Sequence, residues 1–348
     1  MNQTLKLLCL TAACAMVTSY AQASDVIYNS TTGATYAYIL NEQSNANSFT
    51  KCSVDANGIE EYSCTNVTPV DESGQPVLND PDNMVLYANY AYITNYSSGA
   101  ITECPINANG IDATNCKNIL PTASSKALLT SAAGIAFNGN YGYILNGSGE
   151  NYVQCSIKNN QLNLNACTKY TPRDKQGNLL LTKSDEITFN NYFAYFVDTN
   201  YSATFTKCQT GAQGIILKSC KNFVLPYNLT TTTNLAFHQQ QAYFVSSTPA
   251  GEIVYSRCGL DSSGINVGSC IDEPVDIPVS SLNIPMAINF NANIMYITVV
   301  GLDIGSSKDV GSYVECQTSE SGIKPGTCFT TTANFLKIPG TIVFNSVN

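Results

Sequence analysis

Twelve of the 14 cysteines in this 348-residue chain form six pairs with one constant spacing. The two members of each pair are 12 positions apart, and the first members of successive pairs are 52, 51, 53, 50 and 58 positions apart. The pairs are Cys52/Cys64, Cys104/Cys116, Cys155/Cys167, Cys208/Cys220, Cys258/Cys270 and Cys316/Cys328. This regularity indicates a unit of about fifty residues that is repeated six times.

Each repeat has the pattern of four short strands. An apolar stretch such as residues 134–137 is joined by a polar turn to a second stretch such as residues 142–146. A third stretch contains the first cysteine, and a turn such as Asn57-Gly58 leads into a fourth stretch that ends at the second cysteine. Asn-Gly between strand patterns is a strong hairpin signal, because the turn needs residues that tolerate positive φ. Outside the N-terminus, no segment has a sustained helical period.

Four-stranded units that recur four to eight times are typical of β-propellers. A β-solenoid has shorter coils, of about 20–30 residues, and a string of separate four-stranded domains buries too little apolar surface. We therefore predict an all-β fold, a six-bladed β-propeller of four-stranded antiparallel blades. Residues 339–345 repeat the first-strand pattern with no second strand after them, so we expect this C-terminal strand to close the ring as the inner strand of blade 1. Residues 26–29 have a similar pattern, which leaves open how an N-terminal strand contributes to that blade.

The N-terminus has the pattern of a secretory signal peptide. A single Lys6 precedes an apolar run over residues 7–17, and Ala21-Gln22-Ala23 supplies a small-residue cleavage site. We predict a signal peptide over residues 1–23 and one propeller domain over residues 24–348. Lipoprotein processing at Cys14 is the alternative. No later apolar run is long enough for a transmembrane helix, so we expect an exported protein, periplasmic or extracellular.

An even number of cysteines in an exported protein indicates disulfides. The third and fourth strands of each repeat form a hairpin, and facing positions have Cβ atoms about 4.5–5.5 Å apart, which is close to disulfide geometry. We therefore predict that the two cysteines of each repeat bond to each other, six times in all. Eleven intervening residues match neither a zinc-binding nor a Cys-x-x-Cys redox pattern.

The composition excludes several classes of function. A formal net charge of −9, with 12% charged residues, lacks the basic footprint of a nucleic-acid-binding protein. The only histidine, His238, follows an apolar strand at a position where other repeats have turn asparagines, which favours a turn residue over a general base. No nucleophile elbow, phosphate loop or dinucleotide fingerprint occurs, so we predict no catalytic residues, no metal ligands and no cofactor. Structural calcium is the alternative for four aspartates near strand ends, although no Asp-x-Asp-x-Asp-Gly loop is present. These are Asp80, Asp82, Asp185 and Asp198.

The second strands carry a family resemblance. Ala91-Tyr92-Ile93-Thr94-Asn95-Tyr96 and Gly142-Tyr143-Ile144-Leu145-Asn146 resemble the repeat of the YVTN/NHL-like propellers, which are exported prokaryotic proteins. The resemblance covers essentially the whole mature chain, which departs from the usual pattern in its longer repeat and its cysteine pair per blade. It implies a bacterial propeller and carries no catalytic residue with it.

In a four-stranded blade, the loop between strands two and three lies on the same face of the ring as the connection between blades. This loop-rich face holds nearly all the length variation of the repeats, and function usually lies where a rigid scaffold displays variable loops. We expect a non-enzymatic scaffold, a monomer, that binds a protein or glycan there. The candidate contact residues are Tyr96, Asp198, Asn200 and Tyr201. The alternatives are an exported propeller enzyme, a lyase or hydrolase acting at the central channel, and a purely structural envelope protein.

Overall fold

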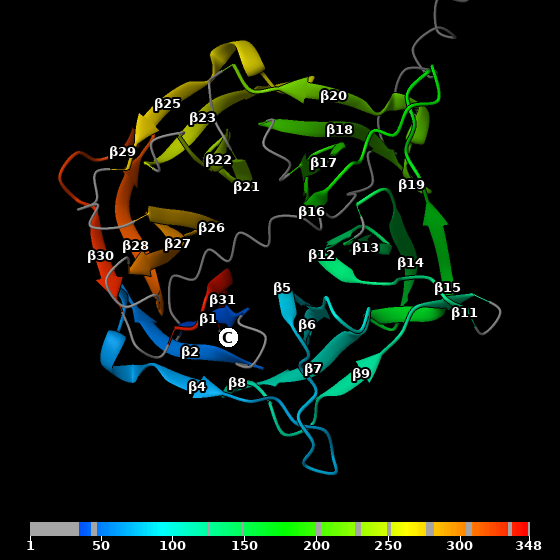
Figure 1. The fold of residues 1–348 in the computed structure, drawn as a ribbon, viewed down its shortest axis with the longest axis horizontal. Coiled ribbons are helices and arrows are strands. Elements are labelled where there is room, and N and C mark those ends of the chain that lie inside the picture. The colour runs from blue at the N-terminus through cyan, green and yellow to red at the C-terminus, as the bar shows by residue number, and fades with distance from the viewer. Residues whose placement is uncertain are drawn as a thin grey trace, which may run out of the picture.

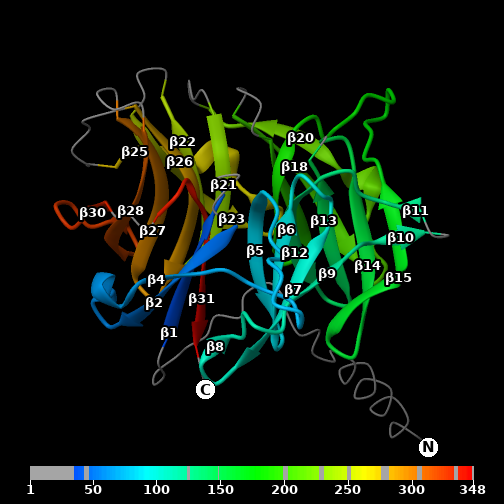
Figure 2. The ribbon, with the colours of Figure 1, turned by 60° about the horizontal axis from the view of Figure 1, so that its bottom comes forward.

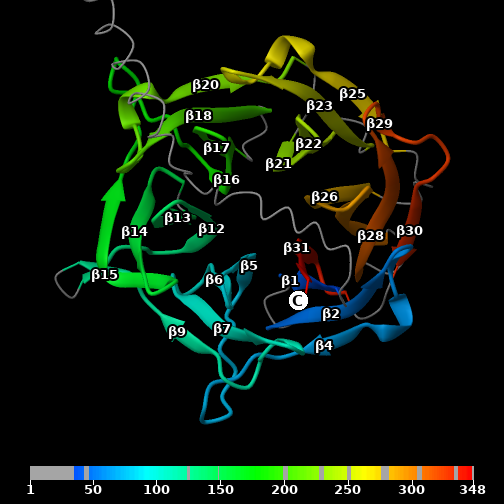
Figure 3. The same cartoon turned by 180° about the vertical axis from the view of Figure 1, so that it is seen from behind.

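The computed structural model is a six-bladed β-propeller, with blades that follow one another around a ring in sequence order (Figures 1 and 3). The structure describes residues 35–42, 47–123, 126–147, 149–198, 203–226, 231–248, 252–275, 282–303, 308–332 and 336–346. The predicted signal peptide, Cys14 and the strand pattern at residues 26–29 lie outside these ranges. The predicted all-β fold and blade count are confirmed.

The inner and second strands of the six blades pair through short turns. The inner strands, in the order of blades 1 to 6, are β31 (Pro339–Ser346), β5 (Pro81–Tyr87), β12 (Ala132–Asn138), β16 (Ser184–Asn190), β21 (Thr231–His238) and β26 (Leu282–Asn291). The second strands are β1 (Thr35–Asn41), β6 (Tyr90–Asn95), β13 (Tyr141–Asn146), β17 (Phe193–Asp198), β22 (Gln241–Ser247) and β27 (Ile294–Asp303). In blade 6 the inner three strands are longer than elsewhere, which accounts for its wider cysteine spacing.

The third strand of each blade holds the first cysteine, and the outer strand pairs with it. The third strands are β2 (Ser48–Asp55), β7 (Ile101–Asn107), β14 (Tyr152–Lys158), β18 (Thr204–Gly211), β23 (Ile253–Asp261) and β28 (Lys308–Ser319). The outer strands are β3 and β4 (Gly58–Ile59, Thr65–Val67), β8 and β9 (Gly110–Ile111, Lys117–Ile119), β15 (Gln161–Tyr170), β19 and β20 (Gly214–Ile215, Lys221–Val224), β24 and β25 (Gly264–Ile265, Ile271–Pro274), and β29 and β30 (Gly322–Ile323, Phe329–Thr332).

The outer strand differs from the prediction, because it does not end at the second cysteine. In blade 3 it runs without a break through Cys167, which lies inside β15 and pairs in register with Cys155. In the other five blades it is broken into two pieces, and the second cysteine lies between them, outside either strand. These cysteines are Cys64, Cys116, Cys220, Cys270 and Cys328.

The outer strand resumes directly after the second cysteine. In three blades a 3-10 helix occupies the break: η1 (Glu61–Ser63), η2 (Leu217–Ser219) and η3 (Val267–Ser269). The second piece begins at the next residue in all five blades, since the disulfide brings the backbone back into register with the third strand. Between blades 2 and 3, a small hairpin of β10 (Thr122–Ala123) and β11 (Lys126–Ala127) lies against β15.

Ring closure follows the prediction. Strand β31 pairs antiparallel with β1, so the C-terminal strand completes blade 1 (Figure 1). Apolar residues of the first and last blades pack across this junction, including Ile39, Tyr296 and Ile342. Figure 2 shows the red β31 beside the blue β1 from the side.

The hydrophobic core lies between adjacent blades. Each junction has its own cluster, in which the second-strand tyrosine of one blade packs against the inner and second strands of its neighbour. All six of these tyrosines are fully buried: Tyr38, Tyr92, Tyr143, Tyr195, Tyr243 and Tyr296. A buried tyrosine contributes a large apolar area and a polar end, and Tyr38 uses that end to accept a hydrogen bond from Ile111 N–H in blade 2 at 3.0 Å.

Six disulfides join the two cysteines of each blade, with Cα–Cα distances of 4.0–4.2 Å. The bonded pairs are Cys52–Cys64, Cys104–Cys116, Cys155–Cys167, Cys208–Cys220, Cys258–Cys270 and Cys316–Cys328. The predicted bridge within each blade is therefore confirmed. Each bridge attaches the outer strand to the rest of its sheet, where the ring would otherwise have a weakly held edge. Six disulfides indicate that the protein matures in an oxidising environment.

Candidate functional site

In blades 1 to 4, a polar side chain at the end of the second strand holds the connection between blades. Asn41 Oδ1 accepts a hydrogen bond from Lys337 N–H at 2.9 Å, and Asn95 Oδ1 accepts one from Asn79 N–H at 2.7 Å. Such bonds satisfy backbone donors in segments that belong to no strand. The resemblance to the Tyr-Val-Thr-Asn repeat singled out this asparagine, and its role here is structural.

Asp198 occupies the same position in blade 4. Its carboxylate accepts hydrogen bonds from Thr182 Oγ1 at 2.5 Å and from Lys183 N–H at 3.1 Å, and the residue is 8% exposed. The candidate contact Asp198 therefore holds the connector of its own blade. The candidates Asn200 and Tyr201 lie outside the described residues.

Tyr96, the remaining candidate, lies at the loop-rich face and is 39% exposed. Its ring packs on Gly147 of blade 3, where an added Cβ would overlap the ring. Its hydroxyl donates to Gly147 O at 3.4 Å. The glycine therefore fixes the ring across the junction of blades 2 and 3, with one part open to solvent.

Three aspartates, Asp80, Asp82 and Asp185, lie near Tyr96, and Glu42 and Glu186 lie near these aspartates. We call these five carboxylates the axial cluster. Asp82 and Asp185 occupy the same position, one residue into the inner strands β5 and β16. The inner strands surround the ring axis (Figure 1), and each begins at the edge where the second strand ends. The cluster therefore lies at the loop-rich end of the axis and draws on blades 1, 2 and 4.

The other blades have no acid at this position. The equivalent residues of β12, β21 and β26 are Ala133, Thr233 and Met286. In blade 1 the position is Gly340, where an added Cβ would overlap the Glu42 carboxylate. Because glycine leaves this space free, the Glu42 side chain lies directly against the closing strand. At this position the inner strands thus carry an acid in blades 2 and 4 and an uncharged residue in the other four blades.

The pairing register of the inner strand shifts at this point in all six blades, and in blades 2 and 4 two successive polar residues lie there. The pairing register shifts between Pro81 and Met84, and again between Ser184 and Glu186. Because every blade has this shift, it belongs to the repeat, and the side chains that it presents differ from blade to blade. Here Asn83 Nδ2 donates to Glu186 Oε2 at 2.9 Å, which joins blades 2 and 4 past the intervening blade 3.

Burial and mutual repulsion raise the pKa values of these carboxyls. The pKa of Asp82 rises to about 8, mainly through burial and further through Asp185 and Asp80. Burial likewise raises the pKa of Glu186 to about 8, although the hydrogen bond from Asn83 opposes the shift. The pKa of Glu42 is raised by burial and then by the neighbouring aspartates. Part of the axial cluster therefore carries protons at neutral pH and can both donate and accept hydrogen bonds.

The axial cluster as a unit was not predicted from the sequence. Asp80, Asp82 and Asp185 were singled out as aspartates near strand ends, but only the closed ring brings them together with Glu42 and Glu186. Among the described residues, no group of three or more His, Cys, Asp or Glu side chains is arranged to hold a metal ion. The described helices include none long and apolar enough to cross a membrane.

A second repeated feature links each blade to the next. The residue before the first cysteine reaches the turn between the third and outer strands of the following blade, and we call these six residues the latch residues: Lys51, Glu103, Gln154, Lys207, Arg257 and Glu315. Gln154 donates to Gln213 O at 3.0 Å, and Glu315 accepts from Ile59 N–H at 3.0 Å. Their charges differ from blade to blade, so nothing in the sequence alone indicates a shared role.

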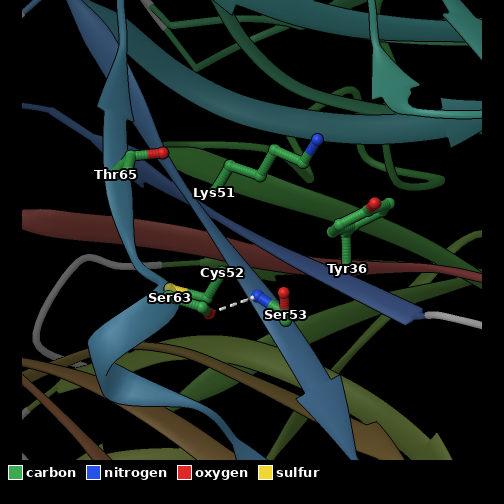
Figure 4. Close-up of a pocket in the computed structure, with 6 residues that line it drawn as sticks. All are labelled: Tyr36, Lys51, Cys52, Ser53, Ser63 and Thr65. Carbon is green, nitrogen blue, oxygen red and sulfur yellow. Dashed lines mark hydrogen bonds between the residues drawn. The ribbon is translucent and has the colours of Figure 1, made fainter.

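A shallow hollow of about 230 Å³ lies beside the latch residue Lys51 (Figure 4). The Lys51 ammonium lies 3.9 Å from the centre of the Tyr36 ring and donates to Asn109 O of blade 2. Ser53 N–H donates to Ser63 Oγ at 2.7 Å on the other side of the hollow. These groups are occupied by contacts within the protein, so the hollow belongs to the blade junction.

No family model matches the chain, and no curated protein matches its sequence. Solved structures do resemble it. A hypothetical selenium-binding protein from Sulfolobus tokodaii has a TM-score of 0.50 at 9% identity, covering 90% of this chain and 93% of that one. A 6-phosphogluconolactonase candidate from Bacteroides uniformis has a TM-score of 0.49 at 11% identity, over 90% and 85% of the two chains. Apo AztD from Citrobacter koseri has a TM-score of 0.48 at 12% identity, over 90% and 98%. At these identities the likeness shows the propeller fold alone.

Proposed function

We propose that this chain is an exported, non-enzymatic binding propeller that recognises a protein or glycan at its loop-rich face. The observation that supports the proposal best is the convergence of the axial cluster with the half-open ring of Tyr96 on that face. Carboxyls that carry protons near neutral pH, beside an aromatic ring, suit a ligand rich in hydroxyl or cationic groups. We propose that the protein acts as a monomer without a cofactor, in the periplasm or outside the cell.

We also propose that the chain is related to the YVTN/NHL-like propellers. It is supported by the second-strand tyrosines, which fill the blade junctions, and by the asparagines that hold the connectors. Both features stabilise the scaffold, so the sequence of the loop-rich face can vary without loss of the fold.

The test compares the two faces of the ring. The full mature chain is applied to a glycan array and to arrays of basic, neutral and acidic peptides. We expect saturable binding that falls at least about tenfold in Tyr96→Ser and in the double variant Asp82→Asn/Asp185→Asn. The matched control is Tyr192→Ser, because Tyr192 is 76% exposed on a turn of the opposite face. Equal losses in Tyr96→Ser and Tyr192→Ser would contradict a site at the loop-rich face.

The second candidate function is an exported lyase or hydrolase acting at the ring axis. The observation in its favour is that the pKa values of Asp82 and Glu186 are raised to about 8, which suits a general acid at neutral pH. Turnover of a polysaccharide panel by the wild type, abolished in Asp82→Asn, would support the enzyme. Binding without turnover over the same panel would support the scaffold.

A further inference from the structure

Two turns of this protein share one tetrapeptide. Residues 56–59 and 108–111 both read Ala-Asn-Gly-Ile, and both form the turn between the third and outer strands. The turns also match in detail. Asn57 N–H donates to the side chain of Asp55 at 2.7 Å, and Asn109 N–H donates to the side chain of Asn107 at 2.8 Å. The turns differ locally at one position, since the Asp55 carboxylate also accepts a hydrogen bond from Asn57 Nδ2 at 3.2 Å, whereas the neutral Asn107 takes this place in the second turn.

The neighbouring blade gives the two turns opposite charges. In blade 2 the peptide oxygen of Asn109 accepts a hydrogen bond from the Lys51 ammonium, and an added Cβ on Gly110 would lie 3.3 Å from Lys51 Nζ. In blade 1 an added Cβ on Gly58 would lie 2.6 Å from Glu315 Oε2. Both contacts come from latch residues at the same position in their repeats.

We propose that Asn109 is a site of spontaneous deamidation, selected over Asn57 by the Lys51 ammonium. Gly110 N loses its proton to solvent base and attacks Asn109 Cγ. The new N–C bond forms as the bond from Cγ to the amide nitrogen Nδ2 breaks, and that nitrogen takes up a proton and leaves as ammonia. Water then opens the resulting succinimide at either carbonyl and gives aspartate or isoaspartate.

The charges act on the nitrogen anion that begins this reaction. Lys51 withdraws electron density through the Asn109 carbonyl and stabilises negative charge on Gly110 N, as hydrogen-bond donors stabilise any developing anion. Glu315 repels the corresponding charge on Gly58 N. Modification at Asn109 also has a structural consequence, because isoaspartate lengthens the backbone beside the carbonyl that Lys51 binds and weakens the link between blades 1 and 2.

The chain has two further Asn-Gly bonds, at Asn138 and Asn146, and Asn146 provides an internal negative control. Asn146 is 2% exposed, and its side-chain oxygen accepts three hydrogen bonds from Thr130 and Ser131. Gly147 N–H is occupied as well, since it donates to Ser131 O at 3.0 Å. With its amide and its nucleophile both held, Asn146 reacts only when the blade opens.

The experiment incubates the folded, disulfide-bonded protein in a mildly alkaline buffer, above the pKa of about 7 that burial gives Glu315. Peptide mapping by mass spectrometry follows amide loss at Asn57, Asn109 and Asn146 in the same molecules. We expect Asn109 to react about tenfold faster than Asn57, a modest share of what unit charges at this range can produce. Equal rates at Asn109 and Asn57 would overturn the proposal.

Two variants and one condition isolate the charge. Lys51→Met should reduce the Asn109 rate toward that of Asn57, whereas Lys51→Arg should preserve it. Glu315→Gln should raise the Asn57 rate alone. In the reduced, denatured protein the difference between the two rates should shrink, because only the folded ring brings Lys51 and Glu315 to the turns, whereas Asp55 stays two residues from Asn57. An Asn109 rate that Lys51→Met leaves unchanged, in a variant that melts like the wild type, would refute the role of Lys51.

Discussion

The latch residue Glu315 joins blade 6 to blade 1, and the pH dependence of stability tests this contact. It lies on β28 of the last blade, is 2% exposed, and accepts a hydrogen bond from Ile59 N–H of blade 1. Burial raises its pKa to about 7 from an ordinary value of 4.5, against the opposing effect of that hydrogen bond. The folded protein therefore holds a proton on this carboxyl that the unfolded protein releases.

The sign of the pH effect follows from linkage. A raised carboxyl pKa leaves stability intact below about pH 4.5 and removes it progressively as the pH rises through about 7. A shift of this size corresponds to about 3 kcal/mol at about 1.4 kcal/mol per unit, and solvent near the rim of the junction reduces this to about 2 kcal/mol. Glu315→Gln keeps an oxygen for Ile59 N–H and removes the titration, so it should stabilise the protein by about 2 kcal/mol above neutral pH and by little at acid pH.

Urea unfolding of wild type and Glu315→Gln over a pH series measures this difference directly, with disulfides intact. A glutamine already occupies the equivalent position in blade 3, where Gln154 is the latch residue. Glu103→Gln is the matched control, because Glu103 is equally buried but pairs with Lys117 at 2.8 Å. Glu103→Gln should lose stability instead of gaining it. A stability difference for Glu315→Gln that does not change with pH would refute the argument.

Three further predictions concern the scaffold. Deleting residues 339–348 removes β31 and should lower the melting temperature steeply, and an unchanged melt would contradict closure by this strand. Replacing Cys258 and Cys270 by alanine removes a bridge around a loop of about a dozen residues and should cost about 3 kcal/mol in urea unfolding, with no cost if the bridge does not form. Tyr38→Phe leaves Ile111 N–H buried without its acceptor and should cost about 1–3 kcal/mol, whereas a neutral result in calorimetry would show that another group takes over.

The roles of single residues could be predicted only where the repeat itself defines them. The equal cysteine spacing predicted the bridges because a hairpin fixes which positions face each other. The break in the outer strand before Cys64 and its equivalents was not predicted, since the spacing is the same in blade 3, where the strand is continuous. Tyr96 could be assigned to the loop-rich face, but not to its packing on Gly147, because that contact crosses two blades. Asp198 had the chemistry of a ligand contact, and only its distances to the connector show what it holds.

The sequence by itself determined the number of blades, the order of strands within each, the disulfide pairing and the closing strand, because these depend on periodicity and on contacts between neighbouring segments. The tertiary structure alone decided what the blades present to one another. Asp82, Asp185 and Glu42 become one acidic cluster only when the ring closes. The same Ala-Asn-Gly-Ile turn meets an ammonium in one blade and a carboxylate in another, because charge at a junction depends on the neighbour that the fold supplies.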